Sequence, residues 1–115
     1  MNLLVTGYIE SGVKKVTDSL NKEKIEFEWH IVCLELVDDD NPTTKFDLDD
    51  FIPELIILVT DSTQKNVEKT STLVQTLKQQ FPYAYKIAIA NYQNLPERLK
   101  PERVEELLGL TTYGR

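Results

Sequence analysis

The sequence predicts an α/β protein: a three-layer sandwich in which helices cover both faces of a mostly parallel sheet of about four to five strands. Residues 55–59 are an uncharged run of leucine and β-branched side chains, typical of a strand buried on both faces. After Thr63, apolar side chains recur every three or four positions, as they do on one face of a helix. Because such strand–helix units repeat, the crossovers should be right-handed and the strands parallel.

The first expected unit is a short strand at residues 3–6, a turn at 7–12 and a helix from Val13 to Asn21. Residues 25–37 predict one long or bent strand, because their first half alternates apolar and polar side chains. Turn-forming residues at 38–42 end that strand. The expected buried face of the first helix consists of Val13, Val16 and Leu20.

Residues 47–51 suit one helical turn before the buried strand. The helix after that strand is expected to be capped by residues 61–63 and to end before Pro82. A further strand is predicted at 85–90, and a loop at 91–96 follows it. The buried face of the capped helix should consist of Val67, Thr70, Val74, Leu77 and Phe81.

Pro101 suits the first position of a last short helix, which Gly109 should end. The tail at 111–115 shows no pattern. The chain of 115 residues is one domain, residues 1–115, large enough for a single core.

Composition excludes several functional classes. A net charge of −6 argues against binding to nucleic acid, and no apolar run is long enough to span a membrane. The first residues enter a strand pattern without a basic leader, so we expect a cytoplasmic protein. Cys33 lies among apolar residues and should be a buried core thiol. The acidic residues between 38 and 50 are interpreted as a solvated loop, and His30 as a strand-surface residue, rather than as metal or catalytic sites.

Three loops together resemble those of Ras-like small GTPases, nearest to the gliding-protein (MglA-type) and related archaeal and bacterial GTP-binding proteins. Gly7 and Gly12 have the spacing of the phosphate-binding loop G-x-x-x-x-G-K-[ST]. Residues 58–63 resemble a strand end and helix start of that family, and residues 90–96 with 99–110 resemble its N-K-x-D-L-P loop and the following helix. The resemblance implies a P-loop GTPase-like fold that lacks the family's C-terminal strand and helix.

The sequence departs from the family where the chemistry is done. The phosphate-loop lysine falls on Val13, and the hydroxyl that holds magnesium falls on Lys14. In the base-reading loop Asn91 matches, but Tyr92 replaces the lysine and Asn94 the aspartate, whose carboxylate would accept two guanine hydrogens. The D-x-x-G element falls on residues 38–41, which contain no glycine.

The resemblance therefore implies a vestigial nucleotide site with no catalytic residue, no metal site and no cofactor. Its residues would be Gly7, Gly12, Lys14, Asn91 and Asn94. We expect a pseudo-GTPase that works by binding a protein partner or a second copy of itself. Two alternatives stay open: a small GTPase that binds GTP or GDP with Mg²⁺ weakly, and a structural subunit of an assembly.

The same resemblance predicts a binding surface. With only the first helix on one face of the sheet, some of that face should be open, because four strands are wider than one helix. Glu35 and Lys86 place one charge each in flanking strands, and both could point to that face. Phe27, Trp29 and Tyr85 favour association there.

Overall fold

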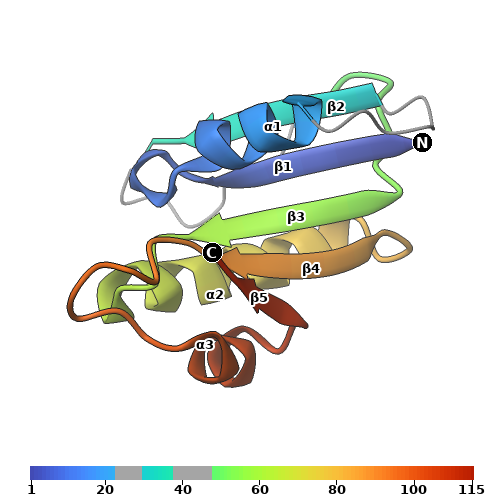
Figure 1. Ribbon diagram of the computed structural model, residues 1–115. Coiled ribbons are helices and arrows are strands. Elements are labelled where there is room, and N and C mark those ends of the chain that lie inside the picture. Colours follow the sequence, from blue (N-terminus) through green and yellow to red (C-terminus); the bar gives the residue numbers. More distant parts are fainter. Residues whose placement is uncertain (23–29, 38–47) are drawn as a thin grey trace.

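The computed structural model describes residues 1–22, 30–37 and 48–115. Within them, five strands form one parallel sheet in the order β2-β1-β3-β4-β5 (Figure 1). The strands are β1 (Asn2–Tyr8), β2 (His30–Leu36), β3 (Leu55–Thr60), β4 (Tyr85–Ala90) and β5 (Thr112–Gly114). The helices are α1 (Val13–Lys22), α2 (Gln64–Gln80) and α3 (Pro101–Leu108), and a short 3-10 turn, η1 (Ile9–Ser11), precedes α1.

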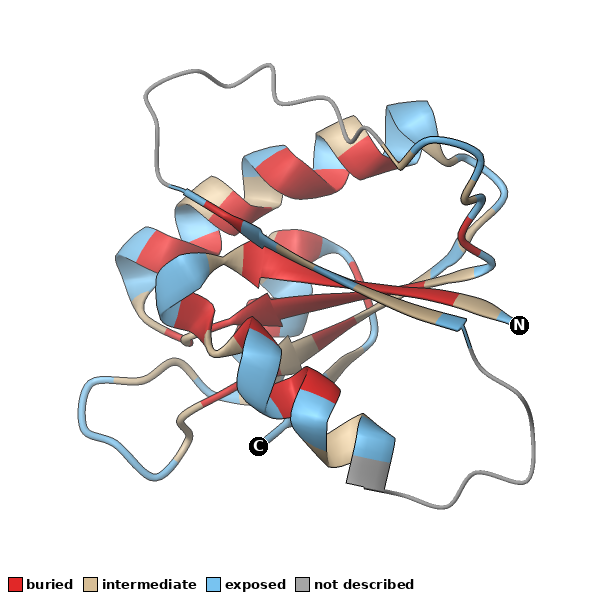
Figure 2. Ribbon diagram, turned by 90° about the horizontal axis from the view of Figure 1, so that it is seen from above, coloured by how far each residue is buried: buried red, intermediate tan, exposed pale blue. Residues whose placement is uncertain are grey.

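The predicted α/β class is confirmed, with α1 on one face of the sheet and α2 and α3 on the other. The buried residues, red in Figure 2, follow the central strands and the helix faces turned toward them. Successive side chains of a strand point to opposite faces, so each central strand supplies both sides of the core. On the α2 and α3 side, Leu4, Ile56 and Leu58 pack under Val74, Leu77 and Val104. On the α1 side, Leu3, Val5, Ile57 and Val59 pack under Val13 and Val16.

The unit β3–α2 forms as the sequence predicts. β3 is the third of five strands and its last five residues are buried. At the start of α2, the Thr63 hydroxyl accepts a hydrogen bond from the Asn66 N–H, and the Asp61 carboxylate accepts one from the Thr63 N–H at 2.9 Å. These side chains satisfy N–H groups that lack partners within the helix, which fixes where α2 begins.

The C-terminal segment corrects the sequence analysis. Residues 112–114 form β5, parallel to β4, where we expected no pattern and a missing last strand. The Ala88 N–H donates to the Thr111 carbonyl and the Arg115 N–H to the Ala90 carbonyl, each at 2.9 Å. Three residues are too few to show an alternation, so backbone pairing rather than side-chain pattern defines this strand.

The edge strand β2 supplies a second correction. Cys33 is exposed rather than buried, because β2 is the edge strand of the sheet that the described residues form and has an exposed residue at this position. His30 is exposed at the start of β2. The first half of the long strand expected at 25–37, with Phe27 and Trp29, and most of the acidic segment at 38–50 lie outside the described residues. At 48–51 the described part is a turn, in which the Phe51 N–H donates to the Leu48 carbonyl, rather than a helix.

The two mid-strand charges lie on opposite faces of the sheet. Glu35 shares its face with Ile31, which packs on the α1 side. Lys86 shares its face with Ala88 on the α2 side, where its ammonium donates to the carbonyls of Phe81 at 2.6 Å and Ala84 at 2.9 Å. Burial, with a smaller contribution from Lys78, lowers the pKa of Lys86 below its ordinary value. No charge of β4 therefore interrupts the face on the α1 side.

None of the described helices is both long and apolar enough to cross a membrane.

Candidate functional site

The carboxyl ends of the parallel strands meet at one edge of the sheet, where open α/β proteins bind their ligands. Two of the residues singled out in the sequence, Gly12 and Asn91, lie in contact there. Asn94 follows them in the loop after β4. Gly7 lies inside β1, and a Cβ there would collide with the backbone carbonyl of Val59. Lys14 is exposed on α1 and lines neither of the two hollows described below.

The turn after β1 is held by the loop after β4. The Asn91 side-chain amide donates to the Ser11 carbonyl at 3.1 Å, and Asn91 is buried. Gly12 has a φ of 81°, and an added Cβ would stand 2.6 Å from Asn91 Nδ2 and 2.7 Å from the Tyr92 hydroxyl oxygen. Glycine is required here twice over, by the left-handed backbone and by the packed side chains above it.

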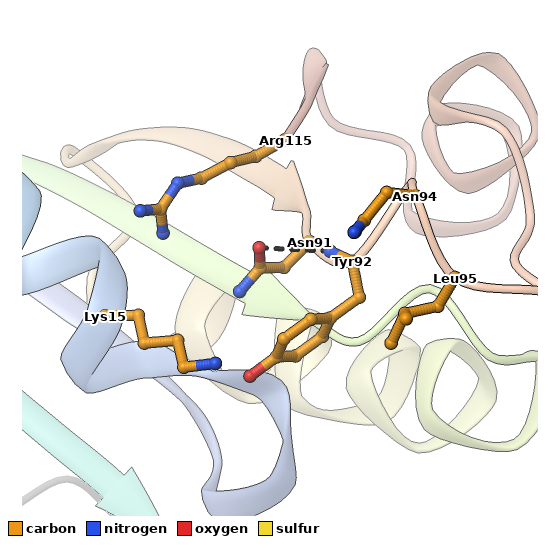
Figure 3. A pocket seen from close by; sticks show the side chains of 6 residues that line it. All are labelled: Lys15, Asn91, Tyr92, Asn94, Leu95 and Arg115. Atoms are coloured by element: carbon orange, nitrogen blue, oxygen red, sulfur yellow. Dashed lines mark hydrogen bonds between the residues drawn. The ribbon is translucent and has the colours of Figure 1, made fainter.

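The first of two hollows lies beside this contact and has a volume of about 510 Å³. Figure 3 shows its lining, in which the Tyr92 ring and the Lys15 ammonium lie next to each other and Arg115 reaches in from the end of β5. The lining residues are Lys15, Asn91, Tyr92, Asn94, Leu95 and Arg115. Among the described residues, no carboxylate side chain lines this hollow, so the side chains of Lys15 and Arg115 make its lining locally positive in an acidic protein.

Both cations of the first hollow are held in place by neutral groups. The Lys15 ammonium lies 4.8 Å from the centroid of the Tyr92 ring, a cation–π contact. The Arg115 guanidinium donates to the Ser19 hydroxyl of α1 at 2.7 Å. Neither group forms an ion pair with a described residue, so each keeps its capacity to bind an anion.

The second hollow, of about 210 Å³, lies between the turn after β1 and the start of α2. Its lining is Glu10, Asp61, Thr63, Lys65, Asn66 and Lys69. Glu10 forms an ion pair with Lys69 and accepts a hydrogen bond from the Asn66 amide at 3.3 Å. Burial alone would raise the pKa of Glu10, but Lys69, the Glu10 backbone N–H and Asn66 outweigh it and lower this pKa. A carboxylate thus occupies the turn in its charged form.

Asn66 connects the turn after β1, the end of β3 and the helix α2, and the sequence analysis did not single it out. Its side-chain oxygen accepts hydrogen bonds from the hydroxyls of Thr60 and Thr70, and its amide donates to Ser11 Oγ at 3.1 Å. It is 2% exposed. The available signal was an asparagine in the first turn of a helix that otherwise turns Val67, Thr70 and Val74 to the core, since a buried amide there needs several partners.

The loop after β4 is fastened to the loop after β3 by Ser62. The Ser62 hydroxyl donates to the Asn91 carbonyl at 2.7 Å and accepts from the Gln93 amide at 2.9 Å. The Leu99 N–H donates to the Ser62 carbonyl at 2.7 Å. Through its hydroxyl, this one buried serine holds in place a loop that lies far from it in the sequence.

Chemically, the edge offers cations, amides and one paired carboxylate. The position that resembles the phosphate-loop lysine is the buried Val13, whose side chain belongs to the core. Among the described residues, no three of His, Cys, Asp and Glu gather to hold a metal ion. The two cations and the amides of the first hollow can bind an anionic group.

The sequence matches no known protein family, and no curated protein is similar enough to it to count as a relative.

Proposed function

We propose that this chain is a non-catalytic, small-GTPase-like module, a pseudo-GTPase, that works by binding another protein. One observation supports this above the others: the turn after β1 is filled by the chain's own side chains. Tyr92 and Asn91 lie against Gly12, and the Glu10 carboxylate stands in the turn with Lys69. A phosphate placed there would meet a fixed negative charge and find no lysine at position 13.

The placement of the loops agrees with the resemblance on which this proposal depends. A nucleotide site of the family needs the turn after the first strand and the base-reading loop to lie together, and here the Asn91 amide joins them directly. The proposal includes no nucleic-acid partner, in keeping with the net charge of −6. It also includes a cytoplasmic location, which suits an exposed free thiol such as Cys33.

A second candidate function is weak binding of GTP or GDP with Mg²⁺. The first hollow favours it, because Lys15 and Arg115 could hold phosphates and the Tyr92 ring offers a face for a base. Asn94 would then select the base. A carboxamide has one acceptor and one donor, which suits the C2 carbonyl of xanthine better than the C2 amine of guanine.

The test is a calorimetric titration with GTP, GDP, xanthosine nucleotides and ATP in the presence of Mg²⁺. We expect every dissociation constant to be weaker than about 100 µM, and GTP hydrolysis no faster than in buffer. Protein isolated with tightly bound nucleotide would overturn the proposal, and so would a magnesium-dependent turnover that Gly12→Val abolishes.

Two lysines of one helix separate the candidates if weak binding is seen. Lys15→Ala should reduce nucleotide affinity if the first hollow is the site. Lys14→Ala is the matched control, since Lys14 lies outside the hollow. Equal affinities for the two variants would exclude the hollow as a nucleotide site.

A further inference from the structure

One face of the sheet is left partly bare beside α1. Figure 1 shows α1 lying over the β1 and β2 side, while none of the described helices lies in front of β4 and β5. Ile57 and Val59 of β3 are buried on this face, whereas Tyr85 is 69% exposed and Tyr113 is 57% exposed. Between these tyrosines lie two partly buried isoleucines. We call this surface the open strip; it consists of Tyr85, Ile87 and Ile89 of β4 and Tyr113 of β5.

The open strip has the length of a short helix. The six residues of β4 make it about 20 Å long, and it is two strands, or about 10 Å, wide only beside residues 88–90, where β5 pairs with β4. An α-helix is about 10–12 Å across, and about 13 residues span 20 Å. The area is therefore less than that of a full rectangle of about 10 by 20 Å, about 200 Å², and far below the roughly 800 Å² that each partner of a stable complex buries. The strip alone is therefore too small to hold two copies of the chain together.

The charges around the strip are unevenly distributed. At its carboxyl end stand Lys15 and Arg115, and no acidic side chain is among the described residues that line their hollow. A ligand that lies along the strip should carry acidic groups at one end only, where they meet the two cations.

We propose that the open strip binds a single amphipathic helix of a partner protein, about 13 residues long, whose acidic end contacts Lys15 and Arg115. This inference rests on the proposed function and names the kind of partner that the module binds. Apolar side chains of the helix pack on Ile87, Ile89 and Tyr113. The interface is small, so the affinity is modest and depends on salt.

The experiment uses the full chain and a displayed library of 16-residue peptides. The peptides keep a helical apolar pattern and carry randomised Glu, Lys or Ala at both ends. We expect selection to enrich helices with Glu at one end, and synthetic copies of them to become helical by circular dichroism when the protein is added.

Matched variants locate the site. Tyr113→Glu should weaken binding of an enriched peptide at least tenfold, while Tyr83→Glu, in the fully exposed turn before β4, should leave it unchanged. Lys15→Glu should weaken binding at least fivefold and shift the enriched charge from Glu to Lys, while Lys14→Glu should do neither. Tyr113 and Lys15 are both exposed, and thermal unfolding of each variant verifies that it folds.

Three results would overturn the inference. The first is enrichment of peptides without a charge bias, and the second is equal binding of an enriched peptide to Tyr113→Glu and to the unchanged chain. The third is a dimer in sedimentation that Tyr113→Glu dissociates, because a second copy of the chain would then be the occupant of the strip. None of these bears on nucleotide affinity, so the inference can fail while the proposed function stands. Tight nucleotide binding, measured separately, would instead overturn the proposed function, whatever the open strip binds.

Discussion

The two faces of the sheet are covered to different degrees. On one face, α2 and α3 bury Leu4, Ile56, Leu58, Ala88 and Ala90 of the inner strands, and the Lys86 ammonium donates to two carbonyls there. On the other, α1 buries β1 and β3 and leaves Tyr85 and Tyr113 in water. The difference teaches that the two faces contribute unequally to the core: the first is fully covered, and the second leaves apolar surface available for the binding that we propose.

The largest test of this division compares one residue from each face. Leu58→Ala, on the α2 side, should lower the free energy of unfolding by about 3 kcal/mol, because a fully buried leucine leaves a cavity. Tyr113→Ala on the open strip should lower it by less than about 1 kcal/mol. Urea denaturation measures both. Equal losses would show that the open strip belongs to the core after all.

The next test compares two amides. Asn66→Ala should cost about 2 kcal/mol of stability, because the hydroxyls of Thr60 and Thr70 lose their acceptor while buried. Asn94→Ala, at the exposed first hollow, should change stability by no more than about 0.5 kcal/mol. Thermal unfolding of the two variants provides the comparison. If Asn66→Ala left the stability unchanged, the hydrogen bonds of Asn66 would contribute nothing measurable to holding α2 on its face of the sheet.

Two glycines sharpen the comparison further, since both have left-handed backbones. Gly109 ends α3 with a φ of 69°, and an added Cβ would touch only the far end of Lys78, so Gly109→Ala should cost about 1 kcal/mol. Gly12 precedes α1 and is covered by Asn91 and Tyr92, so Gly12→Ala should cost about 2 kcal/mol. The excess at Gly12, read from denaturant midpoints, measures how tightly the loop after β4 closes the turn. No excess would mean that Tyr92 simply moves aside.

The smallest expected effect is a dependence on pH. The folded-state pKa of Glu10 is below the ordinary 4.5, so its contribution to stability is present above about pH 4.5 and is lost as the pH falls through the lowered folded-state value. Glu10→Gln should flatten the loss of stability in that acidic range. Glu106→Gln removes an exposed pair with Arg103 and serves as the control. The measurement is the midpoint of thermal unfolding of each variant from pH 3 to pH 7. The same dependence of this midpoint on pH in both variants would contradict the prediction.

The sequence predicted most of the fold because its strong patterns are long. The apolar run of β3 and the three- and four-residue spacing of α2 each extend over enough positions to exclude other structures. β5 escaped detection because three residues carry no period, and Cys33 was misplaced because an apolar run does not reveal which strand lies at an edge. Tertiary pairing decided both cases.

The candidate site was only partly readable for a different reason. Gly12 and Asn91 were marked by their resemblance to known loops, and the structure brings them together. Lys15 and Arg115 belong to no motif and join the site only because the fold brings the end of β5 to α1, where Arg115 donates to Ser19. Asn66 likewise acts through partners that come from three separate segments. Such convergence depends on the folded chain and has no local signature.

The order of the strands also bears on how the chain is made. β1 is synthesised first but needs β3 as its second neighbour, and the pair Leu3 and Leu55 is separated by more than fifty positions. Until β3 is made, one side of β1 has no strand partner, and an unpaired strand edge invites pairing with other chains. We expect truncated chains that end before Leu55 to aggregate and truncated chains that extend past Gln80 to stay in solution. Centrifugation of the two truncated chains would reveal the contrast.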